Sequence, residues 1–187
     1  MIDQINVLVD ISHWNRDVDF AKLANAGIIG VIQKATQGQT GVDFTYNTNK
    51  PKALAAGLLW GAYHFGDGSD GVAQAEHFLS TVNDQSKTLL ALDFESNPTG
   101  PSMDVVEAAA FVTHVQQQTG RFTGFYSGND IKQQLGREGS RAGTMLVLVG
   151  PIRAYTCSPR ELAYMDDVAI HRWQFRPTSP RRCGRAV

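Results

Sequence analysis

The sequence predicts an α/β fold with a largely parallel sheet, and two features support this. Short apolar segments alternate along the chain with longer segments whose apolar residues recur at helical spacing. Polar residues gather directly after the apolar segments, as expected where parallel strands end at one edge of a sheet. The 187 residues, 42% hydrophobic and 19% charged, suffice for one domain with a substantial core.

The predicted elements follow in order along the chain. In the first predicted helix, Phe20, Leu23 and Ala24 recur at helical spacing and Gly27 ends the pattern. The last predicted helix carries Val105 and further apolar residues along one side. The predicted strands cover residues 5–11, 28–33, 58–65, 88–95 and 122–127, and the predicted helices cover 17–26, 47–56, 72–82 and 103–119. The pattern weakens after about residue 135, where 144–149 and 169–175 are predicted as two further strands.

Polar side chains stand at the carboxyl ends of five predicted strands. They are Asp10-Ser12-His13, Lys34-Thr36-Gln37, Tyr63-His64, Asp93-Glu95 and Tyr126. In a β/α barrel the active site lies at this end of the strands. Five strands that bring polar groups to one rim therefore predict an active site there.

Asp93 and Glu95 at the end of an apolar strand are the first candidates for catalysis. Side chains alternate along a strand, so these two should face one way, with Cα atoms roughly 6–7 Å apart, while Phe94 faces the other way. Two neighbouring carboxylates repel each other, so the pKa of at least one should rise. One protonated and one ionised carboxyl are what cleavage of a glycosidic bond requires.

Glu95 is predicted to be the general acid, with a strand-end carboxylate in a salt bridge or helix cap as the structural alternative. Asp93 could attack the anomeric carbon or orient a neighbouring N-acetyl group that attacks instead. The spacing does not decide, because rotamers of Asp and Glu cover both the roughly 5–5.5 Å of retaining and the 6.5–9.5 Å of inverting pairs. A buried partner for a lysine or arginine is the structural alternative for Asp93.

Other polar and aromatic residues complete the candidate site. Asp10 is either a third acid at the rim or an Asx-turn residue that starts the loop to the first helix. Lys34 ends a strand and is expected to pair with an acid there. Tyr63, Tyr126, Trp14 and Trp173 offer rings on which sugars stack. Two residues are expected in the core instead, Trp60 by packing and His64 by hydrogen bonding.

Composition argues against several classes of function. The formal net charge of −1 does not indicate nucleic-acid binding, although acidic residues dominate up to residue 130 and basic ones after it. No Walker loop, dinucleotide fingerprint or zinc-type Cys/His cluster is present, so no metal or cofactor is expected. Cys157 and Cys183 are interpreted as two free thiols, with a disulfide between them as the alternative. No signal peptide or membrane-spanning run is visible, so export by another route or release at lysis is expected.

Five motifs follow one another at residues 9–15, 31–38, 61–65, 92–95 and 124–127. In their residues and their order they resemble glycoside hydrolase family 25, the Chalaropsis-type lysozymes or N-acetylmuramidases. This resemblance implies a single-domain irregular, TIM-like β/α barrel that hydrolyses the β-1,4 bond after N-acetylmuramic acid in peptidoglycan. It implies Glu95 as acid/base, Asp93 as nucleophile or stabiliser of a substrate-derived intermediate, and Asp10 as the first-strand acid. It also implies that Tyr63 and Tyr126 line the groove, and it implies no cofactor.

The C-terminal part departs from the family pattern. Trp173-Gln174-Phe175 resembles the family's late strand, but no Asp or Glu follows Asp167. Residues 1–175 are therefore interpreted as the catalytic domain, expected to work as a monomer, and residues 176–187 as a basic tail that is solvated or binds anionic wall polymers. The rival hypothesis is a non-catalytic peptidoglycan-binding barrel with a divergent C-terminus. A chitin-type glycosidase is disfavoured because Ala91 stands where such enzymes carry another aspartate.

Overall fold

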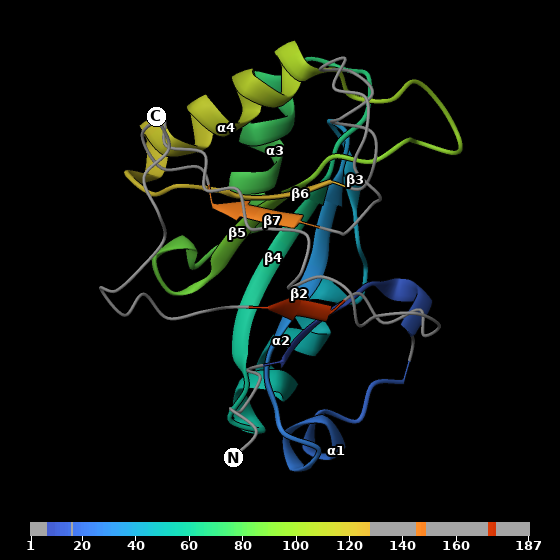
Figure 1. Cartoon of the computed structure of the whole chain (residues 1–187), viewed down its shortest axis with the longest axis vertical. Coiled ribbons are helices and arrows are strands. Elements are labelled where there is room, and N and C mark those ends of the chain that lie inside the picture. The colour runs from blue at the N-terminus through green and yellow to red at the C-terminus, as the bar shows by residue number, and fades with distance from the viewer. Residues whose placement is uncertain (1–6, 16, 128–144, 149–171, 175–187) are drawn as a thin grey trace, which may run out of the picture.

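A curled, mainly parallel sheet forms the centre of the molecule, as Figure 1 shows. The computed structural model describes residues 7–15, 17–127, 145–148 and 172–174. The strand order is β7-β6-β5-β4-β2-β1-β8, and β3 pairs with β2. The strands are β1 (Val7–Ile11), β2 (Ile28–Gln37), β3 (Gly41–Val42), β4 (Leu59–Phe65), β5 (Leu89–Asp93), β6 (Gly124–Ser127), β7 (Met145–Leu148) and β8 (Arg172–Gln174).

The five central strands β1, β2, β4, β5 and β6 run parallel to one another. At the two ends of this order, β7 pairs with β6 and β8 pairs with β1, both antiparallel. The curled parallel sheet is a half-barrel, which confirms the predicted α/β class and its irregular barrel form. The carboxyl ends of the five central strands consequently lie at the same edge of the sheet.

The helices begin and end at residues whose chemistry explains the boundaries. Asp19, Asp70 and Asp104 cap α1, α3 and α4, because each side chain accepts a hydrogen bond from a backbone N–H three residues on. Gly120 ends α4 in the left-handed conformation, at φ 68°. The helices are η1 (His13–Asn15), α1 (Phe20–Asn25), α2 (Tyr46–Ala55), α3 (Gly71–Thr81), η2 (Gln85–Lys87) and α4 (Val105–Thr119).

Two apolar clusters lie on the two faces of the sheet. The larger one packs the sheet against the helices and contains alternate strand residues such as Trp60, Ala62 and Leu92. The smaller one, on the concave face, is formed by Leu8, Ile32 and Tyr126. This alternation follows from the two-residue period of a strand, and it decides which polar residues reach the concave face.

An irregularity in β2 differs from the sequence prediction, which ended this strand at residue 33. The strand continues to Gln37, and its register against β4 shifts between Lys34 and Thr36. Because Ala35 is the additional residue in this bulge, Thr36 turns to the helix side and is buried beside His64. The short strand β3, which pairs with the end of β2, was not predicted either.

Some predictions fall on parts of the chain that the structure does not describe. The pairing state of Cys157 and Cys183 and the tail of residues 176–187 lie outside the described residues. In the described part of the chain, every helix is too short or too polar to span a bilayer.

Candidate active site

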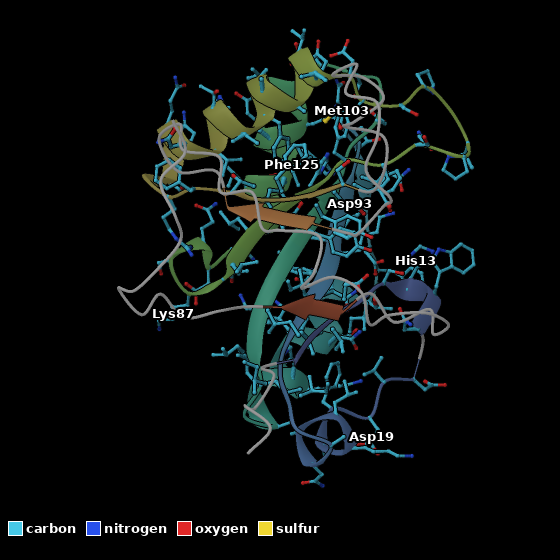
Figure 2. All side chains as sticks on the ribbon, in the orientation of Figure 1. His13, Asp19, Lys87, Asp93, Met103 and Phe125 are labelled. Carbon is cyan, nitrogen blue, oxygen red and sulfur yellow. The ribbon has the colours of Figure 1, made fainter. Side chains whose placement is uncertain are left out.

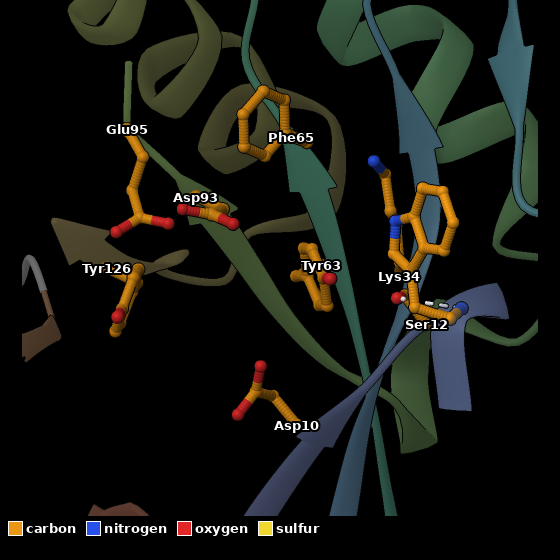
Figure 3. A pocket seen from close by; sticks show the side chains of 9 residues that line it. Asp10, Ser12, Lys34, Tyr63, Phe65, Asp93, Glu95 and Tyr126 are labelled. Carbon is orange, nitrogen blue, oxygen red and sulfur yellow. Dashed lines mark hydrogen bonds between the residues drawn. The ribbon is translucent and has the colours of Figure 1, made fainter. Parts of the chain in front are cut away.

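A pocket of about 200 Å³ opens at the carboxyl ends of the parallel strands (Figure 3). Residues from all five central strands, or from the segments directly after them, line this pocket, as the polar strand ends predicted. The lining residues are Asp10, Ser12, Trp14, Lys34, Tyr63, Phe65, Asp93, Glu95 and Tyr126. The structure thus brings together every predicted site residue except Trp173, which lies in β8 opposite Leu8 and whose side chain lies outside the described part.

Strand register explains why these side chains meet. Lys34 of β2 is the partner of Tyr63 in β4, and Asp93 of β5 is the partner of Tyr126 in β6. Partners in adjacent parallel strands point to the same face of the sheet. The concave face therefore receives two pairs of polar side chains. The second pair stands two residues further along the sheet than the first, because the partner of Asp93 in β4 is Phe65.

The Asp93–Glu95 segment is held by the residue between its two acids. Phe94 is 1% exposed, and its ring packs 5.6 Å from the ring of Phe125. Its backbone N–H donates to the carbonyl oxygen of Tyr126 at 2.8 Å, which continues the sheet hydrogen bonding past the end of β5. Both acids consequently line the pocket while Phe94 faces the helices, as the alternation predicted.

Figure 3 shows the arrangement of the carboxylates. Glu95 and Asp93 lie on one side of the pocket next to Tyr126, and Asp10 reaches in from the opposite side. Asp10 is half-buried, and the cap of the first helix is Asp19. Asp10 thus lies at the rim of the pocket, and its role as a third acid stays a prediction.

Tyr63 stands between these acids and stays protonated. Burial raises the pKa of its hydroxyl well above 10, and the negative charges of Asp93 and Asp10 raise it further. A hydrogen bond with Ser12 lowers the pKa, but by less. A protonated phenol can donate a hydrogen bond in a pocket rich in carboxylates. Tyr63 can thus bind a substrate hydroxyl or amide oxygen without adding negative charge.

Lys34 brings positive charge to the same wall. Its ammonium donates to Oε1 of Gln37 at 2.6 Å and lies 4.8 Å from the centre of the Phe65 ring. Burial lowers the pKa of Lys34, and the negative charges of Asp43 and Asp93 act in the opposite direction. Lys34 thus interacts with the nearby acids Asp43 and Asp93 through the attraction between opposite charges.

Other candidates lie away from the pocket. Trp60 is 5% exposed and belongs to the core, as expected. His64 is buried between Thr36 and Gln74, with nitrogen–oxygen distances of 2.7 and 2.9 Å, which confirms a hydrogen-bonding core histidine. Among the described residues no group of three or more His, Cys, Asp or Glu side chains could hold a metal ion.

Phe65 and Asp43 were not predicted from the sequence as residues of the site. Phe65 follows Tyr63 by two residues in β4 and lines the pocket, so strand alternation could have identified it. Asp43 lies after the glycine-rich turn and carries no local signal. Its side chain is fully buried and receives hydrogen bonds from a segment thirty positions earlier, which only the fold reveals.

Comparisons with known proteins identify the family of this chain. The family model of Glycosyl hydrolases family 25 matches residues 9–180. Lysozyme M1 of Streptomyces globisporus is 37% identical over 98 residues, which cover 49% of this chain and 33% of that protein. The N,O-diacetylmuramidase of Arthroderma benhamiae is 28% identical over 152 residues, covering 75% and 65% of the two chains.

A solved structure agrees with the fold as well. The muramidase from Acremonium alcalophilum superposes with a TM-score of 0.64 at 32% identity, covering 71% of each chain. The match with Lysozyme M1 spans only about a third of that relative.

Proposed function

This chain belongs to glycosyl hydrolases family 25, and we propose from this that it is a muramidase. Its substrate is bacterial peptidoglycan, and the bond cut is the β-1,4 bond between N-acetylmuramic acid and N-acetylglucosamine. The names of its relatives, lysozyme and N,O-diacetylmuramidase, support the substrate class. The observation that carries the proposal is the pocket in which Asp10, Asp93 and Glu95 meet at the carboxyl ends of the strands.

In this proposal Glu95 is the general acid. It protonates the leaving glycosidic oxygen and then takes a proton from the attacking water. Its position just after β5, on the backbone anchored by Phe94, gives the carboxyl a fixed direction into the pocket. Such fixed placement is what proton transfer to one particular oxygen requires.

Asp93 acts next to Glu95 in one of two ways. It forms the glycosyl ester itself, or it accepts a hydrogen bond from the substrate N-acetyl group while that group attacks the anomeric carbon. Asp10, on the opposite wall, binds substrate amide or hydroxyl groups and adds to the negative field that favours positive charge at the reacting carbon. Both roles use ionised carboxylates.

The remaining wall of the pocket binds the substrate. Tyr63 donates a hydrogen bond from its protonated hydroxyl, and Lys34 offers its ammonium to carbonyl or carboxylate oxygens of the muramic acid side chain. Tyr126, 5% exposed and in register with Asp93, presents its hydroxyl end to the sugar. Trp173 is the fourth residue to which we assign substrate contact. A monomer suffices, since one chain supplies every residue named.

The proposal is tested by the products formed from purified bacterial cell walls. Borohydride reduction of the new reducing ends should convert muramic acid to muramitol and leave glucosamine unreduced. Glucosaminitol instead would overturn the muramidase assignment in favour of a glucosaminidase. A folded protein that sediments with the walls but forms no reducing ends would support the rival hypothesis of a non-catalytic binding barrel.

A further inference from the structure

We propose that His13, Trp14 and Phe44 form an aromatic platform that binds sugar residues of the glycan strand beyond the catalytic pocket. This inference rests on the proposed function, because it assigns an outer subsite to the same glycan. The platform joins the 3-10 turn η1 after β1 to the segment after β3. His13 marks its position at the outer edge of the molecule in Figure 2.

Large aromatic surface is exposed at this place. Trp14 is 79% exposed and Phe44 is 73% exposed. The ring of His13 lies between them, 4.6 Å from the Trp14 ring and 5.6 Å from the Phe44 ring, centre to centre. Trp14 also lines the pocket that contains Glu95 and Asp93. The platform is therefore continuous with the candidate active site.

Asp43 anchors the platform through hydrogen bonds with His13. Its fully buried carboxylate accepts hydrogen bonds from the backbone N–H of His13 at 2.8 Å and from Nδ1 of the same residue at 2.9 Å. Its other oxygen accepts from the backbone N–H and the hydroxyl of Thr45, at 2.9 and 2.6 Å. Burial alone would raise the pKa of Asp43, but these hydrogen bonds outweigh it and lower the pKa.

This support extends further into the core. The hydroxyl of Thr45 accepts from Nε2 of Gln33, and Oε1 of Gln33 accepts from the side chain of Asn49. On the other side, the backbone N–H of Ser12 donates to Asn15, which closes the turn that carries Trp14. The buried polar network thus fixes the ring of His13 and the two segments that carry Trp14 and Phe44. A surface whose supporting segments are fixed is preorganised for a ligand, which reduces the entropy cost of binding.

The size of the pocket indicates which ligand covers the rings. At about 200 Å³ the pocket is smaller than sites that enclose a whole small ligand, so a polymer must continue across its rim. Sugar rings present apolar C–H faces that stack on aromatic rings, and the platform offers such faces next to the rim. Removing about 50 Å² of ring face from water corresponds to roughly a tenfold change in affinity.

The test compares glycan strands of two lengths after the stem peptides have been removed with an amidase. Trp14→Ala and Phe44→Ala should raise the KM for long strands by about tenfold, and by a clearly smaller factor for tetrasaccharides. Asp43→Asn should raise the same KM, because it releases His13, and its folding is checked by thermal unfolding. Phe122→Ala is the control, since Phe122 is 41% exposed and lies before β6, at the strand ends away from the pocket.

Each result has a defined meaning. Equal KM changes for long and short strands, or changes no larger than that of Phe122→Ala, would overturn the platform while leaving the muramidase intact. A KM effect seen only on strands that keep their peptides would assign the platform to the stem peptide and likewise overturn the inference. Absence of any cleavage by the folded wild type would instead count against the proposed function.

Discussion

Asp93 and Tyr126 are register partners in the parallel strands β5 and β6, and the next residue, Phe94, donates its backbone N–H to the Tyr126 carbonyl. This pair links the candidate acids to the rest of the sheet. The hydrogen bonding between β5 and β6 continues one residue beyond the end of β5. The backbone that leads to Glu95 therefore has a fixed direction. The stability of the site thus depends on the packing of a residue that points away from it.

Replacement of Phe94 by alanine should destabilise the protein and loosen the pair of acids. Phe94 is 1% exposed, and such truncations cost about 3–5 kcal/mol of the free energy of unfolding. Urea unfolding measures this cost. Phe122→Ala, at a residue 41% exposed, should cost much less. Equal losses at the two positions would contradict the anchoring role of Phe94.

Asp93→Asn should lower kcat on cell walls by roughly a hundredfold or more while KM changes little, because the charge acts on the reacting carbon. Walls with de-N-acetylated muramic acid separate the two proposed roles. If the N-acetyl group is the nucleophile, the wild type should not cleave such walls. If Asp93 is the nucleophile, the wild type should still cleave them. A kcat for Asp93→Asn within a few-fold of the wild type would exclude both roles.

His64 should make the protein less stable in acid. Burial lowers its pKa from 6.5 to about 4, so the unfolded chain binds a proton that the folded chain does not. The free energy of unfolding should therefore fall as the pH drops from about 6.5 to about 4 and lose about 3 kcal/mol from this group.

The same unfolding series with His64→Gln isolates this contribution, since glutamine cannot titrate. The difference between wild type and variant should depend on pH only within that window. His77→Gln serves as the control histidine, because it is nearer the surface and donates to a single carbonyl oxygen. A pH-independent difference for His64→Gln would contradict a neutral, buried histidine.

Gly38 should resist replacement more than Gly57 does. Both have positive φ, 56° and 79°, so alanine strains the backbone at either position by about 1 kcal/mol. A Cβ at Gly57 meets nothing within 4 Å, whereas at Gly38 it would collide with the carboxylate of Asp67. Thermal unfolding should show a larger loss for Gly38→Ala, and equal losses would mean that Asp67 gives way freely.

The sequence allowed a good prediction of the fold and of the site's position, for a clear physical reason. Strand alternation and the common edge of parallel strands are periodic, so Asp10, Tyr63, Asp93 and Tyr126 could be assigned to one rim. The two-residue period failed at Thr36, where the bulge at Ala35 turns the side chain to the core. A bulge depends on pairing with β4 and leaves no local pattern.

The aromatic platform was also beyond sequence reasoning. Trp14 was a visible candidate for sugar stacking, but the contact of its neighbour His13 with Asp43 joins segments separated by the whole of β2. Such a contact becomes visible only once the register of the strands is known. The role of Trp173, by contrast, stays a prediction, because its side chain lies outside the described residues.

Clearing of purified cell walls by Glu95→Gln, compared with the wild type and with Glu76→Gln, tests the central claim most directly. Glutamine keeps the shape of Glu95 but cannot supply a proton, so clearing should slow by roughly a hundredfold or more. Glu76, whose side chain is 65% exposed, gives the same chemical change outside the pocket and should clear like the wild type. Clearing by Glu95→Gln within a few-fold of the wild-type rate would show that the reaction does not depend on this carboxyl.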